Sequence, residues 1–464
     1  MKKNQMTKSF LLGGTLFLVA CGTQAQPVAP TENVEVIIAD TETRVVRVWS
    51  DNATSQVVRE RQVADWNATV GAEEGIYIDY VIFGGGWADT IRLAAQTDEA
   101  PEIFRPNGAF IREFIDAGFL HPLSVLPDME DFIAKYDGQL IVNHQIFDDE
   151  VFTVPWNLTT YRFLINRDIF DRNSLEGVPE TWEEVREFAR IITENGGGEE
   201  FGFILGLQSP WTMSAYLHRP AGVIMGHHGF NHHTLNFEFY RLAPVIDAIS
   251  GMLADGSVFP GASGLDADAK RAQFGQGRVG MIPAASFDVG AYNSTFYADF
   301  NWEVHAVPSL NNGPSPYRPL VDGTNILGIG TAALASPEMM EAVSIVFRWL
   351  HSDEIAAELY EEGLYIPIRQ EAIDLAAGEP ELRGFAEFAD NADALMLIPT
   401  PEGHVILEGE GINGTLIYAI ANPNADPLTV LTDLDSRLNV AIHTQLTPEE
   451  LATFGAYPGR DNRR

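Results

Sequence analysis

Residues 151–195, VFTVPWNLTTYRFLINRDIFDRNSLEGVPETWEEVREFARIITEN, decide the fold of this chain. Residues 151–154 are a β-branched run that a proline stops, because proline cannot donate a hydrogen bond to a strand ladder. The alternation in residues 161–166 predicts a second strand with unequal faces. Thr181 and Glu184 form a capping-box pattern, and apolar residues recur behind it at three- and four-residue spacing. The stretch therefore predicts strand, turn, strand, loop and amphipathic helix, with Trp156 at a strand end, where ligands bind in open α/β sheets.

The part of the chain that precedes this stretch alternates strand and helix patterns. Residues 45–49 form a buried type of strand, and residues 76–82 alternate as another. Helices are predicted at 54–70 and 88–96, and a third strand at 102–104. Strands that alternate with helices pair in parallel through helical crossovers, so the sequence predicts an α/β fold.

Several short motifs occur in an order that resembles one protein family. TVPW (153–156), INRDIF (165–170) and VPETWEEV (178–185) resemble a run shared by the extracellular solute-binding proteins of ABC importers. The closest likeness is to the carbohydrate-binding, maltose-binding-protein-like group. GFLHPL (118–123) and GLYIPIR (363–369) resemble further pieces of the same family, and the likeness covers roughly residues 44–445.

This resemblance implies a fold and a division into domains. The fold is α/β and two-lobed, of the periplasmic-binding-protein-like type II, with each lobe a mostly parallel sheet flanked by helices. Several segments are expected to cross between the lobes. The predicted parts are a signal peptide (1–20), a lipidated flexible tether (21–43), lobe 1 (44–154 plus 325–375) and lobe 2 (155–324 plus 376–464).

The charge of the chain limits its partners. The formal net charge is -36, and only five of the 464 residues are lysine. Nucleic-acid binding depends on basic surface that displaces counterions from phosphates, so this class of partner is excluded. An acidic surface keeps an exported protein soluble, and we expect a monomer.

The only cysteine predicts where the protein is located. Lys2, Lys3 and Lys8 precede an apolar run at 10–20 that is too short to span a bilayer and is typical of a signal peptide. The run ends in LVAC (18–21), which resembles a lipobox, so Cys21 is predicted to carry a lipid. We therefore expect a protein anchored through this lipid to the outer face of the cell membrane, extracellular or periplasmic.

Candidate ligand-binding residues follow from the chemistry of sugars. Sugars have polar rims and apolar C–H faces, so their sites combine flat aromatic rings with amides and carboxylates. Such side chains at predicted strand ends and crossings are Asp51, Trp87, Asn107, Trp156, Trp211, Asp322, Asn325 and Tyr365. For each tryptophan the alternative is core packing, which we expect for Trp182, Trp302 and Trp349. Ser286 and Phe287 occupy the place of the family's ligand loop, without its usual glycine and tryptophan.

A histidine cluster, GHHGFNHH, contains His227, His228, His232 and His233. Imidazoles at this density can bind zinc, nickel or copper. No cysteine or carboxylate lies among the four, so we expect a solvated hairpin turn and no metal or other cofactor.

The sequence favours binding over catalysis. It contains no G-x-S-x-G or H-E-x-x-H motif and no free cysteine nucleophile, so we expect no enzyme activity. The resemblance implies a lipoprotein that captures a carbohydrate or related polar solute between its lobes and delivers it to an ABC permease. Two alternatives remain open: a surface glycan-degrading enzyme that uses a pair of carboxylates, and a binding protein for a metal chelate or other non-sugar solute.

Overall fold

The computed structural model describes residues 43–52, 55–83, 86–106, 110–311, 313–324, 327–455 and 463. The predicted signal peptide and residues 21–42 of the predicted tether, with Cys21, lie outside these residues, as do Asn107 and Asn325. None of the helices in the described part of the chain has the length and apolar character needed to cross a membrane.

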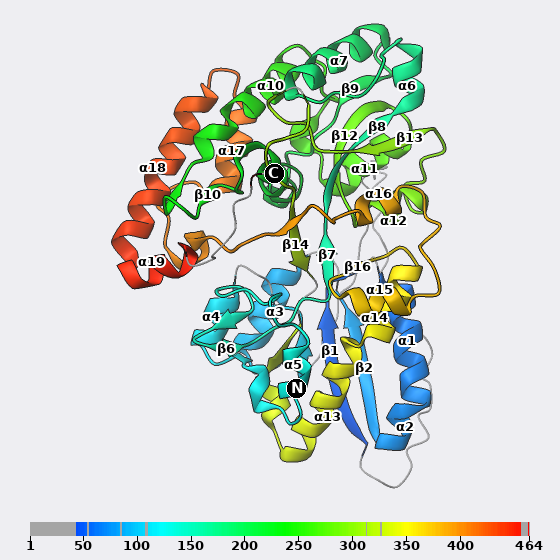
Figure 1. Ribbon diagram of the computed structural model, residues 1–464, viewed down its shortest axis with the longest axis vertical. Helices are drawn as coiled ribbons and strands as arrows, with labels where there is room; N and C mark the ends of the chain where they lie inside the picture. Colours follow the sequence, from blue (N-terminus) through cyan, green and yellow to red (C-terminus); the bar gives the residue numbers. More distant parts are fainter. Residues whose placement is uncertain are drawn as a thin grey trace, which may run out of the picture. The chain divides into compact units, whose positions relative to one another are not determined.

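The first sheet has the strand order β2-β1-β3-β15-β4. Its strands β1 and β2 are labelled in the lower part of Figure 1. Its strands are β1 (Arg44–Ser50), β2 (Ile76–Ile82), β3 (Ile103–Phe104), β4 (Leu120–His121) and β15 (Gly328–Gly330). β1 runs parallel to β2 and β3, whereas β15 runs antiparallel to β3 and β4. The helices that accompany this sheet are α1 (Gln56–Ala68), α3 (Trp87–Gln96), α4 (Ile111–Asp116) and α13 (Pro337–Leu350). The strands and helices predicted for this part are confirmed.

The second sheet has the strand order β13-β8-β12-β9. Its strands are β8 (Tyr161–Asn166), β9 (Phe201–Phe203), β12 (Val279–Ala285) and β13 (Trp302–His305). β8 runs antiparallel to β12 and β13, and β12 runs parallel to β9. In each of these two sheets all strands except one therefore run in the same direction. The reversed strand is β15 in the first sheet and β8 in the second.

Both reversed strands come directly from segments that cross between the two sheets. These segments form a third sheet of order β16-β7-β14-β17, in the middle of Figure 1. Its strands are β7 (Asn157–Thr159), β14 (Leu320–Thr324), β16 (Ile366–Pro367) and β17 (Leu395–Met396). β7 leads into β8 and β14 leads towards β15, so the crossing direction explains why those two strands are reversed.

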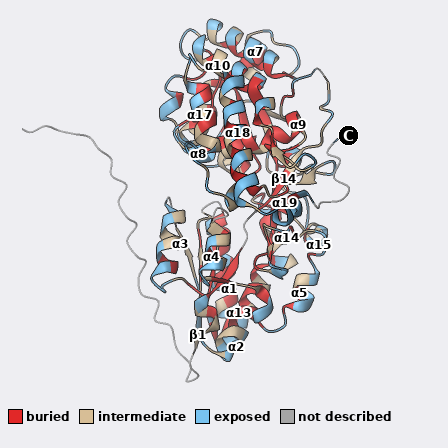
Figure 2. Ribbon diagram, turned by 90° about the vertical axis from the view of Figure 1, so that its left-hand side faces the viewer, coloured by how far each residue is buried: buried red, intermediate tan, exposed pale blue. Residues whose placement is uncertain are grey.

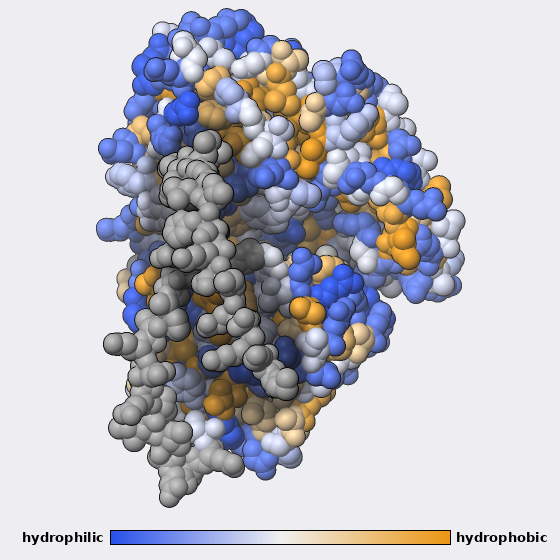
Figure 3. All heavy atoms as spheres, turned by 180° about the vertical axis from the view of Figure 1, so that it is seen from behind, coloured by the Kyte–Doolittle hydropathy of each residue, from blue (hydrophilic) through white to orange (hydrophobic). Residues whose placement is uncertain are grey.

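The helix predicted behind Thr181 buries its apolar face, as its residue spacing indicated. Thr181 and Glu184 make the reciprocal hydrogen bonds of a capping box at the start of α7 (Trp182–Asn195), as predicted. Helices α10 (Ala243–Ala254), α17 (Ile412–Ala421) and α18 (Pro427–Gln445) contribute to the same core, which is red in Figure 2. Trp182 and Trp302 are buried in core clusters, as expected. On the face shown in Figure 3, hydrophilic residues predominate, with smaller hydrophobic patches among them.

The prediction of one strand over residues 151–154 is wrong. Strand β6 (Glu150–Val151) ends at Val151 because it pairs with β5 (Ile146–Phe147) in a tight hairpin. Asp148 and Asp149 have φ values of 51° and 66°, the left-handed conformation that a two-residue hairpin turn requires. Val154 instead forms an isolated bridge with Leu327 beside the crossing segments.

Candidate functional site

Two predicted site residues meet at the ends of strands β1 and β3. Asp51 directly follows β1, and its Oδ1 lies 2.5 Å from a guanidinium nitrogen of Arg105, which directly follows β3. Trp87 begins α3 and donates its indole N–H to the carbonyl oxygen of Arg105 at 3.1 Å. The Trp87 side chain is only 5% exposed, and its ring lies 5.3 Å from that of Phe83. Asp51 and Arg105 therefore offer polar groups at this strand end, while Trp87 holds the loop in place.

Two other predicted residues, Trp156 and Tyr365, line one small cavity of about 10 Å³ together with Asn157. Both rings are almost completely buried, at 9% and 6% exposed. The guanidinium carbon of Arg59 lies 4.6 Å from the Trp156 ring centroid. Burial raises the pKa of Tyr365, and the neighbouring Ser55 hydroxyl and the positive charges of Arg59 and Arg105 act against that rise. Tyr365 therefore lies within electrostatic reach of the Asp51–Arg105 pair.

An aromatic platform, defined by Trp211, Phe287 and Tyr216, lies on the side of the second sheet. Trp211 stands in α8 (Pro210–Met213) and is 48% exposed. Its ring centroid lies 5.8 Å from that of Phe287, with 36° between the planes, and 5.9 Å from that of Tyr216. Phe287 comes from the segment where the resemblance expects a ligand loop. The platform thus offers exposed aromatic surface, although that loop lacks the family's tryptophan.

A buried polar network anchors this platform from below. The Asp288 carboxylate accepts hydrogen bonds from the Tyr216 hydroxyl at 3.0 Å and from Arg271 Nε at 2.6 Å. Lys270 is completely buried, and its ammonium nitrogen lies 3.1 Å from the centroid of the Tyr216 ring. Burial lowers the pKa of Lys270 to about 7 and raises the pKa of Tyr216 well above its ordinary value. The network holds the Tyr216 side chain in place. It also holds the backbone at Phe287, because Asp288 directly follows that residue.

Asp322 lies on the crossing strand β14, in register with Thr159 of β7. It is buried and forms an ion pair with Arg219, whose side chain is partly exposed. The carboxylate is thus already paired with a cation, and its role as a ligand-binding residue remains a prediction.

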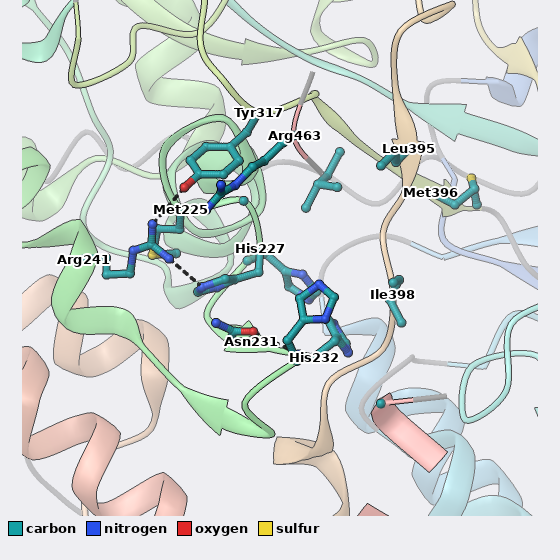
Figure 4. Close-up of a pocket in the computed structure, with 15 residues that line it drawn as sticks. Met225, His227, Asn231, His232, Arg241, Tyr317, Leu395, Met396, Ile398 and Arg463 are labelled. Carbon is teal, nitrogen blue, oxygen red and sulfur yellow. Dashed lines mark hydrogen bonds between the residues drawn. The ribbon is translucent and has the colours of Figure 1, made fainter. Parts of the chain in front are cut away.

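The histidine cluster borders a pocket of about 150 Å³ (Figure 4). In this pocket Arg241 points toward Tyr317 and His227, with nitrogen–oxygen and nitrogen–nitrogen distances of 3.1 and 3.4 Å. Leu395, Met396 and Ile398 line another side. Within the described residues no group of three or more His, Cys, Asp or Glu is placed to hold a metal ion.

The expectation of a solvated turn is wrong for two of the four histidines. His227 and His228 are buried, and burial lowers the pKa of His227 to about 4. The reason is tertiary packing: the His228 ring lies 5.6 Å from that of His218, and the adjoining hairpin is bound to α18 through Asn439. Only His233 is exposed.

The sequence did not indicate the arginines that complete these groups. Arg105 lies at a strand end like Asp51, and that position is a signal that could have identified it. Arg59 stands inside a helical pattern and Arg219 within an irregular helical segment, so only the folded chain brings them to Trp156 and Asp322. Asn107 and Asn325 remain predictions, because they lie outside the described residues.

Comparison with solved structures supports the fold. The chain is similar to the GacH receptor of Streptomyces glaucescens, with 17% identity and a TM-score of 0.68 over 86% of this chain and 99% of that one. It is also similar to the maltose/maltodextrin-binding domain MalE of Bdellovibrio bacteriovorus, with 15% identity, a TM-score of 0.65 and coverage of 85% and 98%. A third similar structure is the cyclic α-maltosyl-1,6-maltose binding protein of Arthrobacter globiformis. Its sequence identity is 18% and its TM-score 0.61, over 85% of this chain and 98% of that one. The predicted two-lobed α/β fold of type II is therefore confirmed.

Sequence comparison identifies the family. No curated protein matches the sequence. A family model described as bacterial extracellular solute-binding protein matches residues 62–336, which is more than half of the chain. The match begins within α1, contains both crossing strands β7 and β14, and ends just before α13. The chain belongs to the family of bacterial extracellular solute-binding proteins.

Proposed function

We propose that this protein captures a carbohydrate, an oligosaccharide or related polar solute, between its two lobes and delivers it to the permease of an ABC importer. The observation that carries the proposal is the exposed Trp211 ring beside Phe287 in a chain of this family. A flat ring suits the apolar C–H face of a sugar, and the Asp51–Arg105 pair can satisfy hydroxyl groups on its rim. Among similar structures, the GacH receptor has been solved in complex with acarbose and RafE in complex with raffinose.

The lobe boundaries belong to this proposal. We infer that lobe 1 comprises residues 44–154 plus 325–375 and lobe 2 comprises 155–324 plus 376–464. Core clusters support the main part of this division: one unites residues of β1, β2 and β3 with residues of α13, and another unites residues from β8 to β12 with α17 and α18. Trp156, just past the proposed boundary, packs in the first of these clusters. Closure of two such lobes on a ligand would take place at the crossing strands.

Calorimetry with a panel of acarbose, maltotriose, raffinose and chitin oligosaccharides tests the binding role. We expect one solute to bind with one-to-one stoichiometry and to be recovered unchanged after prolonged incubation. No thermal shift with any member of the panel, nor with polyols, peptides or polyamines, would contradict the proposal. Release of new reducing ends from a glycan would instead support the glycan-degrading alternative.

A lipid anchor at Cys21 is the second part of the proposal. The apolar run followed by LVAC supports it, because small residues before the cysteine admit the signal peptidase. We expect the wild-type chain in the membrane fraction of the producing cell, and the Cys21→Ser variant outside it. Equal recovery of both chains in the membrane fraction would contradict the lipid anchor. The proposed binding role does not depend on that result.

A further inference from the structure

The pocket beside the histidine cluster, which we call the histidine pocket, contains positive charge and no acidic side chain. Its volume is about 150 Å³, and both Arg241 and Arg463 line it. None of the residues that line it in the described part of the chain is Asp or Glu, although 65 of the 464 residues are acidic. The lining of this pocket therefore favours a negatively charged guest, in contrast to the acidic remainder of the protein.

Arg241 is held in place in this pocket and keeps hydrogen-bond donors for a guest. Its Nη2 donates to the Tyr317 hydroxyl at 3.1 Å. Its Nη1 lies 3.4 Å from His227 Nε2 and 3.5 Å from a carboxylate oxygen of Glu238. A hydrogen bond from a guanidinium to a carboxylate is usually about 2.7–2.9 Å long, so the contact with Glu238 is a weak one. The guanidinium has more N–H donors than these contacts use, and 31% of the side chain is exposed, so a guest in the pocket can reach it.

Glu238 is occupied mainly by other partners. Its Oε1 accepts hydrogen bonds from the Asn231 amide at 2.9 Å and from the Thr234 hydroxyl at 3.0 Å. Its other oxygen lies equally far from Arg241 and from His227, at 3.5 Å in each case. Within the part of the chain that the structure describes, no other acidic group lies within ion-pair distance of Arg241. A carboxylate from outside the chain can therefore approach this guanidinium more closely than Glu238 does.

The polar and the apolar residues of the pocket lie on opposite sides (Figure 4). Arg463 lies beside Tyr317, with which it forms an isolated antiparallel bridge, so both arginines are on one side. Leu395 of β17 and Ile398, which follows that strand, line the other side. An inorganic anion would leave this apolar wall without a partner, and an uncharged apolar guest would leave the guanidinium groups without one. A cavity of this volume holds a group of about six carbon atoms, the size of benzene.

We propose that the histidine pocket binds a monocarboxylate with a short apolar tail or ring. The carboxylate accepts hydrogen bonds from the Arg241 guanidinium, and the apolar part lies against Leu395 and Ile398. Such a guest connects the hairpin of β10 (Phe230–Asn231) and β11 (Asn236–Phe237) to the segment that leaves β17. None of the described candidate residues for the carbohydrate lines this pocket, so it is a second site and does not depend on which solute the protein carries.

Calorimetry with benzoate tests the site, because benzoate combines one carboxylate with a ring of the right size. We expect one molecule to bind per chain, with a dissociation constant of about 0.1–1 mM, as is typical of so small a ligand. Benzamide has nearly the same shape but no charge, so it should bind at least about tenfold more weakly. Equal affinity for benzamide, or displacement of benzoate by inorganic phosphate at equal concentration, would overturn the proposal.

A series of carboxylates from acetate to hexanoate tests the apolar wall. Each CH₂ group that the pocket buries should raise the affinity about two- to fourfold. An affinity that does not change with chain length would show that only the charge is recognised, and would contradict a guest with an apolar part.

The variant Arg241→Met tests the link to the guanidinium. It should lower the affinity for benzoate at least about tenfold, because it removes the charge that the carboxylate contacts. The matched control is Arg190→Met on α7, which removes the same charge from an arginine that pairs with Glu194 outside the pocket. This control should bind benzoate as the wild type does. Equal weakening in both variants would mean that net charge governs binding, and would refute the site.

Crystals of the wild-type protein soaked in benzoate test the position of the guest even if Arg241→Met does not fold. The carboxylate should lie within hydrogen-bond distance of Arg241 and the ring against Ile398. Absence of density in the pocket would refute the site, as would density in the crystal without binding by calorimetry. If benzoate and the carbohydrate identified by calorimetry exclude each other completely, both occupy one site, and the proposal of a second site is wrong.

Discussion

Replacing Asp288 with alanine is expected to lower the free energy of unfolding by about 3–5 kcal/mol. The Asp288 carboxylate is completely buried and accepts hydrogen bonds from Tyr216, from Arg271 and from the backbone N–H of Ala285. Without it, the largely buried Arg271 guanidinium keeps only the exposed Asp268 as an ion-pair partner among the described residues, and Lys270 loses the favourable charge of Asp288. Breaking one side of a buried ion pair is costly because the other charge remains out of water.

Asp268 provides a matched control for this prediction. It pairs with the same Arg271, at 2.7 Å, but its side chain is 72% exposed. Asp268→Ala should change the free energy of unfolding by less than about 1 kcal/mol, since exposed pairs contribute little. Urea titrations followed by tryptophan fluorescence measure both variants. Similar losses for Asp288→Ala and Asp268→Ala would show that the buried network does not stabilise the second lobe.

Local patterns predicted most of the fold because their physical causes are local. The capping box at Thr181 and Glu184 depends on residues three apart, and Ser336 caps α13 by the same kind of contact. The alternation in residues 76–82 correctly predicted the buried side chains of Ile76 and Ile78. The strand prediction at 151–154 failed because Val151 belongs to a hairpin whereas Val154 pairs beside the crossing segments. The two ends of this short run thus belong to different structures, which its residue pattern does not reveal.

The candidate site was less predictable because it is built from distant parts of the chain. Position at strand ends led to the prediction of Asp51 and Trp87, and the TVPW motif led to that of Trp156. Their partners come from other elements: Arg105 follows a different strand, and Arg59 approaches Trp156 from α1. The platform joins Trp211 to Phe287 although 76 positions separate them in the sequence. Nothing in either local pattern indicates that contact.

The platform leads to the second prediction, that Trp211→Ala weakens binding of the carbohydrate identified by calorimetry. Trp211 is half-exposed, so a sugar that lies on its ring would bury apolar surface on both partners. Indole rings of this kind are frequent hot spots, and loss of about 1.5–3 kcal/mol corresponds to a dissociation constant roughly 10- to 100-fold higher. The free energy of unfolding should change by less than about 1 kcal/mol, because much of the ring is already in water.

An exposed aromatic ring elsewhere in the second lobe distinguishes stacking from a general loss of aromatic surface. Tyr240 is 45% exposed on a short helix that Asp435 of α18 holds through backbone hydrogen bonds. Tyr240→Ala should bind the same carbohydrate as tightly as the wild type. The affinity of Phe287→Leu should lie between those of the wild type and Trp211→Ala, because leucine keeps apolar contact with Trp211 but has no flat ring. A ligand stacked on the Trp211 ring must lose affinity when the ring is removed. An unchanged dissociation constant for Trp211→Ala would therefore show that the platform does not contact the carbohydrate. The polar groups of Asp51 and Arg105 at the strand ends would then be the main remaining candidate for the binding site.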